Sequence, residues 1–342
     1  MFTATSHRPF FQNMDSSLAA PQSPWSVKKT HPQHGSPAAT ATSVPHWLVA
    51  PFQSIGLEQL NAKADMLERR DNKYVVSANV LERAMDALAD YFDILEIDGK
   101  RDFAYDTCYF DDADHSAYFD HHQGRRIRCK VRMRKYVDAG LCFVEVKLKH
   151  VRGMTIKERL QRPVEMHGTF DDEAQRFVES CFRNLYQREF GRTLQPALRM
   201  RYQRVTLVAK QGGERMTVDI GMAFEGSESV RTVDAGTYLV ETKSGNANGI
   251  ADKILRSLHQ HPTNSCSKYC IAAVALDRVH KFNKFLVPLR KLGTVPVPEA
   301  QPLLAQPLRP KELKVAMAQP APSASSVSRT PWTMGSTTAA VG

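Results

Sequence analysis

The stretch GRRIRCKVRMRKY at residues 124–136 alternates between cationic and apolar side chains. Successive side chains of a β-strand point to opposite faces, so this alternation predicts a half-buried strand over residues 126–136. One face of that strand would carry cations, and the other would carry apolar groups. The cationic face holds Arg126, Arg128, Lys130, Arg132 and Arg134, and the apolar face holds Ile127, Cys129, Val131 and Met133.

A row of like charges on one face needs a counter-charge. Neighbouring cations on such a face lie about 6.6 Å apart, which is twice the rise per residue of a strand. At an effective dielectric constant of about 20, each neighbouring pair repels by roughly 2.5 kcal/mol. Solvent screens this repulsion on an open face, whereas a face that lines a cavity needs an anionic ligand. The net charge of +10 over 342 residues also favours an anionic partner.

The ends of the chain differ in composition from its middle. Residues 1–50 are rich in Ser, Pro, Thr, His and Ala and show no periodicity, so we expect this segment to be disordered. The same holds for the Pro-, Ser- and Ala-rich tail at residues 296–342. Residues 52–292 then form one folded domain.

Cysteine usage and hydropathy predict a cytoplasmic setting. The six cysteines are scattered, and Cys129 and Cys142 fall in apolar registers, which indicates reduced thiols in a core. No apolar run reaches the roughly 18 residues that a membrane span needs. The N-terminus also lacks the apolar core of a signal peptide.

The remaining periodic segments predict an α+β fold of antiparallel strands with flanking helices. Strands are expected at residues 67–76, 103–110, 126–136, 141–149, 198–209, 214–220 and 237–243. Helices are expected at residues 77–92, 171–188, 248–260 and 277–289. The acidic segment 109–120 lacks the glycine of an EF-hand loop and is interpreted as a turn before the cationic strand, in a surface loop that carries His115, His121 and His122.

Other predicted strands carry polar groups on one face too. Those faces hold Glu145, Lys147 and Lys149; Tyr202 and Arg204; Arg215, Thr217 and Asp219; and Glu241 and Lys243. An ordinary open sheet also alternates between apolar and polar residues. This set is biased towards Arg and Lys, and arginine is the residue best suited to bidentate phosphate contacts.

Three carboxylates stand among these cations, namely Glu145, Asp219 and Glu241. Each would repel phosphate unless it pairs with a cation or holds a metal. Mg²⁺ and Mn²⁺ prefer oxygen ligands and are commonly held by one or two carboxylates plus substrate phosphates. Cations for phosphates and carboxylates for a metal are what phosphoryl transfer requires. The chain has no P-loop, and SGNANG at 244–249 is not a dinucleotide-binding motif.

The segment YFDDADHSAYFDHHQGRRIRCKVRMRKYVDAGLCFVEVKLKHVRGMTIKERL at 109–160 closely resembles the VTC (vacuolar transporter chaperone) domain in its short bacterial form. The segments LRMRYQRVTL (198–207), ERMTVDI (214–220) and YLVETK (238–243) resemble that family in the same order. The resemblance covers about 65–290. It implies the triphosphate tunnel fold of the CYTH-like superfamily, an eight-stranded antiparallel β-barrel whose lumen is cationic.

The resemblance also implies an activity. The best-known members of the family polymerise polyphosphate from ATP with Mn²⁺ or Mg²⁺, and relatives with the same tunnel hydrolyse triphosphates. It implies phosphate-handling roles for Lys73, Arg132, Arg134, Lys147, Arg204, Arg215 and Lys268, and a metal-binding role for Glu241.

We therefore expect an ATP-polyphosphate phosphotransferase. The expected catalytic residues are Arg132, Arg134, Lys147, Arg204 and Arg215. The expected substrate-binding residues are Lys73, Lys130, Arg128, Lys149, Lys243, Lys268 and Tyr202. The expected metal ligands are Glu241, Glu145 and Asp219. A tunnel-type triphosphatase and a non-catalytic protein that binds polyphosphate or nucleic acid remain alternatives. Nucleic acid is the weaker of these ligands, because the cationic faces carry only Tyr136 and Tyr202 for base stacking.

Overall fold

The computed structural model describes residues 43–63, 70–149 and 155–296. These ranges lie in the compact unit Met1–Leu304. Most of the two terminal segments expected to be disordered, and the start of the strand expected at 67–76, lie outside the described residues. The N-terminal segment was expected to be disordered up to residue 50. That boundary is too late, because His46–Val49 form the short helix α1 and Leu48 is buried.

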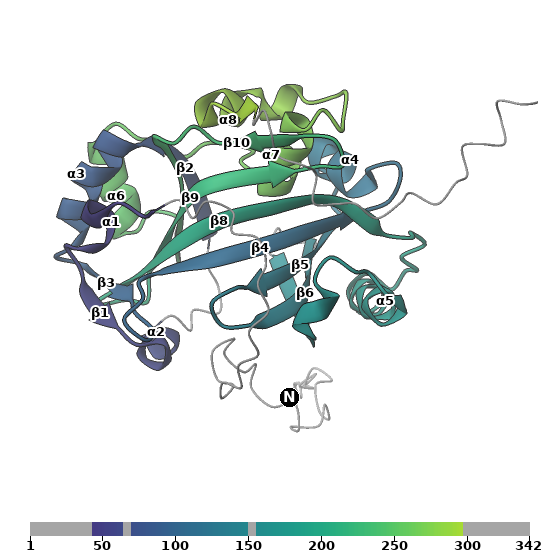
Figure 1. The fold of residues 1–342 in the computed structure, drawn as a ribbon, viewed down its shortest axis with the longest axis horizontal. Coiled ribbons are helices and arrows are strands. Elements are labelled where there is room, and N and C mark those ends of the chain that lie inside the picture. The colour runs from purple at the N-terminus through teal and green to yellow at the C-terminus, as the bar shows by residue number, and fades with distance from the viewer. Residues whose placement is uncertain (1–42, 64–69, 150–154, 297–342) are drawn as a thin grey trace, which may run out of the picture. The chain divides into compact units, whose positions relative to one another are not determined.

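Eight antiparallel strands make up the body of the sheet (Figure 1). In order across the sheet they are β2 (Arg70–Ser77), β11 (Thr237–Ser244), β9 (Arg215–Glu225), β8 (Gln195–Ala209), β4 (Asp102–Asp111), β5 (Cys129–Tyr136), β6 (Leu141–Lys149) and β7 (Thr155–Arg162). Within the described ranges, β2 and β7 are not hydrogen-bonded to one another. The expected α+β class and the sheet of eight antiparallel strands are confirmed.

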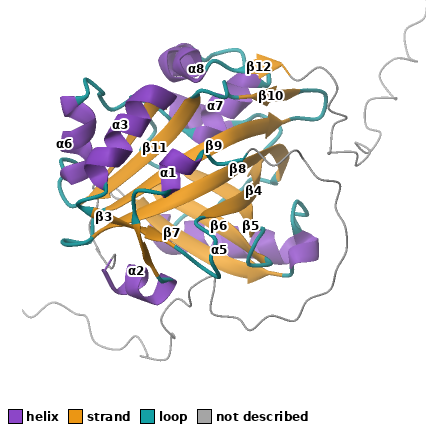
Figure 2. Cartoon of the chain, turned by 60° about the vertical axis from the view of Figure 1, so that its left-hand side comes forward, coloured by secondary structure: helices purple, strands orange, loops and turns teal. Residues whose placement is uncertain are grey.

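Short strands and eight α-helices in the described residues complete the fold (Figure 2). The short strands are β1 (Gln53–Ile55), β3 (Phe92–Leu95), β10 (Val230–Thr232) and β12 (Val295–Pro296). Beyond α1, the helices are α2 (Leu57–Lys63), α3 (Ala78–Leu88), α4 (Ser116–Gln123), α5 (Asp172–Tyr186), α6 (Ile250–Ser257), α7 (Lys268–Ala275) and α8 (Leu286–Leu292).

Helices cover the apolar outer face of the sheet. The helices α3 and α6 pack on Leu207 and Val218 of β8 and β9, and α5 packs on Val131 and Met133 of β5. Because side chains alternate along each strand, burying these residues outside turns their neighbours to the inner face. The cations of β5 therefore point away from α5, into the concave side of the curled sheet.

The helix α7 covers part of this concave side. On β8, Leu198 and Met200 share a face with Tyr202, and all three pack in one cluster with most of α7. Every residue of α7 from Tyr269 to Ala275 is buried. The apolar cluster closes one part of the inner face and leaves the rest to charged side chains.

Several elements differ from the sequence-based expectations. The cationic strand begins at Cys129, so Arg126 and Arg128 precede it. The segment expected to be a surface loop contains α4, in which Tyr118 and Asp120 are buried. Residues 277–282 are not helical, and the last helix begins only at Leu286.

The strand β7 and the helix α7 were not predicted. In β7, Glu158 stands in the apolar register between Ile156 and Leu160 and hides the alternation. After Lys268, the helix α7 is apolar on every side and shows no helical period.

The structure also bears on the cysteines and on membrane spans. All six cysteines are free and buried, as expected for core thiols. Across the described residues, the helices are too short or too polar to cross a membrane.

Candidate functional site

The β5–β6 hairpin brings the first group of charges together. Its antiparallel register sets Arg132 opposite Glu145 and Lys130 opposite Lys147. Both strands alternate, so a tight turn at residues 137–140 is enough to align the polar positions of the two strands on one face. The predicted inner positions of this hairpin therefore share one face.

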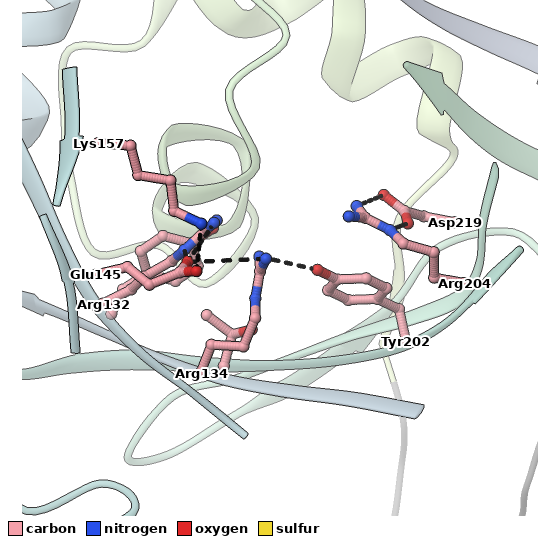
Figure 3. Close-up of polar contacts among 9 residues, drawn as sticks. Arg132, Arg134, Glu145, Lys157, Tyr202, Arg204 and Asp219 are labelled. Carbon is pink, nitrogen blue, oxygen red and sulfur yellow. Dashed lines mark hydrogen bonds and ion pairs between the residues drawn. The ribbon is translucent and has the colours of Figure 1, made fainter. Parts of the chain in front are cut away.

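Glu145 is the centre of a cluster of cations. Arg132 donates to its carboxylate from Nε and Nη2 at 2.6 Å each, Lys157 of β7 also pairs with it, and Arg134 Nη1 lies 3.7 Å away (Figure 3). The Glu145 side chain is only 2% exposed. Burial opposes ionisation, but these three cations hold the pKa of Glu145 well below its usual range. The charge of the Glu145 carboxylate is thus compensated by three cations within the protein.

Arg134 links this cluster to the middle of the sheet. Its Nη2 donates to the hydroxyl of Tyr202 at 3.1 Å, and its Nε approaches Thr107 at 3.5 Å (Figure 3). Its guanidinium also lies 5.2 Å from the ring centroid of Tyr105. Stacking and hydrogen bonding from several strands fix the orientation of this buried cation.

Asp219 forms a second cluster, which includes the start of α7. Arg204 donates to both carboxylate oxygens, at 2.6 and 2.9 Å, and Lys268 Nζ lies 2.6 Å from Oδ2. Burial opposes ionisation, but Arg204 and Lys268 lower the pKa of Asp219 to about 2. Ser267 caps α7 by accepting from the Cys270 amide and also accepts from Lys130 Nζ at 2.9 Å.

Glu241 forms the third cluster, on β11. Lys243 lies 2.7 Å from its Oε1, and Lys73 of β2, its cross-strand partner, lies 3.7 Å from its Oε2. Burial opposes ionisation, but Lys243, Lys73 and Lys268 hold the pKa of Glu241 well below its usual range. The Glu241 side chain is 14% exposed, against 2% for Glu145 and none for Asp219. Glu241 is therefore the most solvent-exposed of the three carboxylates.

Lys147 and Lys130 differ from the cations above. Among the described residues, neither has a carboxylate within ion-pair distance. Water reaches the Lys147 side chain, yet desolvation by the surrounding protein and repulsion from Lys73 lower its pKa to about 8. Lys73 belongs to β2, the strand at the opposite end of the sheet from β7. The sheet therefore curves enough for a charge on β2 to act on a side chain of β6.

Three other expected residues lie at the ends of the inner face. Arg215 opens β9 and is the cross-strand partner of Lys243. Arg128 and Lys149 lie together beyond the start of β5, where the Lys149 amide donates to the Arg128 carbonyl at 3.1 Å. The structure thus gathers most expected residues into three carboxylate-centred clusters and sets Arg128 and Lys149 at one rim.

Two cations of β7 were missed from the sequence. Lys157 pairs with Glu145, and the guanidinium of Arg159 lies 5.2 Å from the ring centroid of Phe143. Both alternate with Ile156 and Leu160, so a strand assignment that tolerated Glu158 would have found them.

The inner carboxylates could hold a divalent cation only together with the substrate. The described residues contain no group of three or more His, Cys, Asp or Glu side chains that could hold a metal by themselves. A metal here would need phosphate oxygens of the substrate as its remaining ligands, a common arrangement for Mg²⁺. Glu241 suits that arrangement best of the three carboxylates, because Glu145 and Asp219 are almost fully buried whereas Glu241 is partly exposed.

Comparison with known proteins identifies a family. The VTC domain model matches residues 68–276, which include all eight strands of the sheet. No curated protein matches the chain.

Solved structures show a distant likeness. A candidate adenylate cyclase from Bacillus halodurans is 12% identical, with a TM-score of 0.38 over 59% of this chain and 95% of that one. A candidate adenylyl cyclase from Hippeastrum with a dominant triphosphatase activity is 13% identical, with a TM-score of 0.35 over 64% and 100%. A protein from Pyrococcus horikoshii is 12% identical, with a TM-score of 0.35 over 61% and 100%.

Proposed function

This chain belongs to the VTC domain family, and from that premise we propose that it is a metal-dependent polyphosphate polymerase. It transfers the γ-phosphoryl group of ATP to the end of a polyphosphate chain and releases ADP. The observation that carries the proposal is the set of cations on the inner face. They come from seven of the eight strands and are anchored by Glu145, Asp219 and Glu241.

The anchored arginines suit phosphate binding. Arg132 and Arg204 each bind a carboxylate through Nε and Nη2, and a guanidinium carries five N–H donors. Each arginine therefore keeps donors for phosphate oxygens while one edge is held in place. Glu145 and Asp219 act in this proposal as positioning residues, and the arginines are oriented before the substrate arrives.

The reaction needs little else from the protein. An oxygen of the terminal phosphate attacks the γ-phosphorus in line, a new P–O bond forms, and the bond to the β-phosphate oxygen breaks as ADP leaves. The attacking phosphate is already anionic, so no side-chain base is required. Arg132, Arg134, Arg204 and Lys147 hold the phosphates in register and neutralise their charge.

Mn²⁺ or Mg²⁺ is the proposed cofactor. When bound, a divalent cation neutralises charge on the transferred and leaving phosphate oxygens. Glu241 would hold it together with oxygens of the substrate. Lys73 and Lys243 already lie beside Glu241, so the same side chains would also contact those phosphates.

The test is an incubation of the purified protein with ATP and Mn²⁺ or Mg²⁺. We expect polyphosphate on a gel and ADP that rises with the phosphate incorporated. ADP accompanied by free phosphate and no polymer would indicate a triphosphatase that uses the same site. Polyphosphate binding without ADP release would contradict both enzymatic functions and leave a polyanion-binding protein.

A further inference from the structure

The cations on and beside the inner face include members of two distinct groups. Those around Glu145, Asp219 and Glu241 have a carboxylate partner, as described above. A second group has none within ion-pair distance among the described residues. This group, which we call the basic strip, consists of Lys147, Lys130, Arg128 and Lys284.

The basic strip leads from the inner face to the surface. Lys147 and Lys130 are cross-strand partners on β6 and β5, and Arg128 precedes β5. Lys284 is exposed and donates from Nζ to the backbone carbonyls of His121 and His122, at 3.5 and 3.3 Å. The strip therefore runs along the end of the hairpin towards the end of α4.

His121 of α4 lies near these cations, and its backbone carbonyl accepts from Lys284. Burial and then the charges of Lys130, Arg128, Lys284 and Lys147 lower the pKa of this imidazole to about 2. The four cations thus act together on one side chain of α4, and all four act in the same direction.

We propose that the basic strip holds the growing polyphosphate chain where it leaves the tunnel beside α4. This inference rests on the proposed polymerase. Carboxylate partners suit the reacting end, where cations must be held in fixed positions. A chain that slides as it lengthens is better served by cations without such partners, because a linear polyanion then supplies the whole counter-charge and no internal ion pair has to break.

The test compares long-chain polyphosphate with tripolyphosphate as ligands, without ATP. In the double variant Arg128→Gln, Lys284→Gln, we expect affinity for the long chain to fall about tenfold at low salt, since each partly exposed charge contributes a few-fold. Affinity for tripolyphosphate should change much less, because the short ligand can be held entirely by the carboxylate-anchored cations. The difference between the two ligands should shrink as salt screens the exposed charges.

A matched double variant removes two exposed cations elsewhere. Arg83→Gln, Lys253→Gln lies on α3 and α6, on the outer side of the sheet, and should leave both affinities unchanged. Should the first double variant fail to fold, Lys284→Gln alone alters one exposed side chain and gives the same comparison with a smaller loss.

The outcomes separate this inference from the proposed function. Shorter products from the strip variant, together with weaker long-chain binding, support the strip. Equal losses for both polyphosphate ligands, no loss for either, or tighter binding of single-stranded RNA than of polyphosphate would overturn it. If the wild-type protein makes no polymer and the strip variant still binds long-chain polyphosphate more weakly, the polymerase proposal is wrong. The basic strip then remains a binding site for long polyphosphate chains.

Discussion

Each of the three inner carboxylates has two or three cations beside it, but the three differ in how exposed they are. Glu145 and Asp219 are buried, and each is closed by two or three cations, whereas Glu241 retains some exposure. Removing one partner of a buried ion pair leaves an uncompensated charge and costs about 3–5 kcal/mol. The three positions should therefore respond differently to the same chemical change.

Glu241→Gln should abolish most activity while the fold is retained. The amide keeps the size of the side chain but loses the charge that a divalent cation needs, and the position is partly open. ADP release as a function of Mn²⁺ concentration measures the effect, and we expect a loss of at least about 100-fold at equal metal concentration.

Glu145→Gln is the matched comparison. It leaves Arg132, Arg134 and Lys157 without their shared partner, so we expect a clear fall in the free energy of unfolding, measured with urea, along with lost activity. Full activity in Glu241→Gln, with strong Mn²⁺ dependence retained, would instead assign the metal to Glu145 or Asp219.

Lys147 should make phosphate binding depend on pH. Its pKa falls from 10.5 to about 8 in the folded protein. Between these two values the unfolded chain binds more protons than the folded one, so this residue makes the free energy of unfolding rise with pH. A bound anion favours the charged amine, so binding should take up protons and weaken as pH rises above about 8.

Calorimetry measures that proton uptake. Tripolyphosphate binding near pH 8.5, repeated in buffers with different ionisation enthalpies, gives the number of protons taken up. Lys147→Arg keeps the charge at this pH and should lower the uptake, leaving the part due to Lys157, whose pKa also falls to about 8. Unchanged uptake in Lys147→Arg would show that Lys147 is charged before the ligand binds.

At the scale of elements, alternation predicted the strands that form the site. The strand Leu141–Lys149 has the predicted bounds, and the polar faces of β5, β6, β8, β9 and β11 lie on the predicted side. The strand β7 was hidden by one acidic residue in its apolar register. The helix α7 was hidden because a helix buried on all sides has no polar face to mark its period. Which carboxylate meets which cation depends on contacts across strands that local patterns do not contain.

Ser267 tests how α7 is attached to the site. Its hydroxyl caps the helix and accepts from Lys130. Ser267→Ala should lower the free energy of unfolding by about 1 kcal/mol, the usual effect of a lost N-cap. Urea unfolding measures this, with Ser257→Ala as a control at an exposed hydroxyl near the end of α6. An equal effect of both substitutions would show that the cap contributes nothing specific.

At the scale of the whole molecule, curvature of the sheet produces the site. Lys73 and Lys147 belong to strands far apart in the sheet order, yet the charge of one lowers the pKa of the other. The helices α3, α5 and α6 bury the outer face, so the inner face can concentrate charge without exposing the apolar residues of the same strands (Figure 2). A flat sheet with the same sequence pattern would scatter these cations over an open surface.

The most direct test compares the wild-type protein with Arg134→Ala for ADP release and chain growth under the same conditions. The substitution removes up to two charge-assisted hydrogen bonds to phosphate, each worth roughly 1.5–3 kcal/mol. If these bonds tighten in the transition state, turnover falls by at least about 100-fold, since each 1.36 kcal/mol is tenfold. We expect the wild type to release one ADP for each phosphate added to polymer, and the folded variant to do so at least about 100-fold more slowly. A wild-type protein that binds polyphosphate yet releases no ADP with Mn²⁺ or Mg²⁺ would contradict the account.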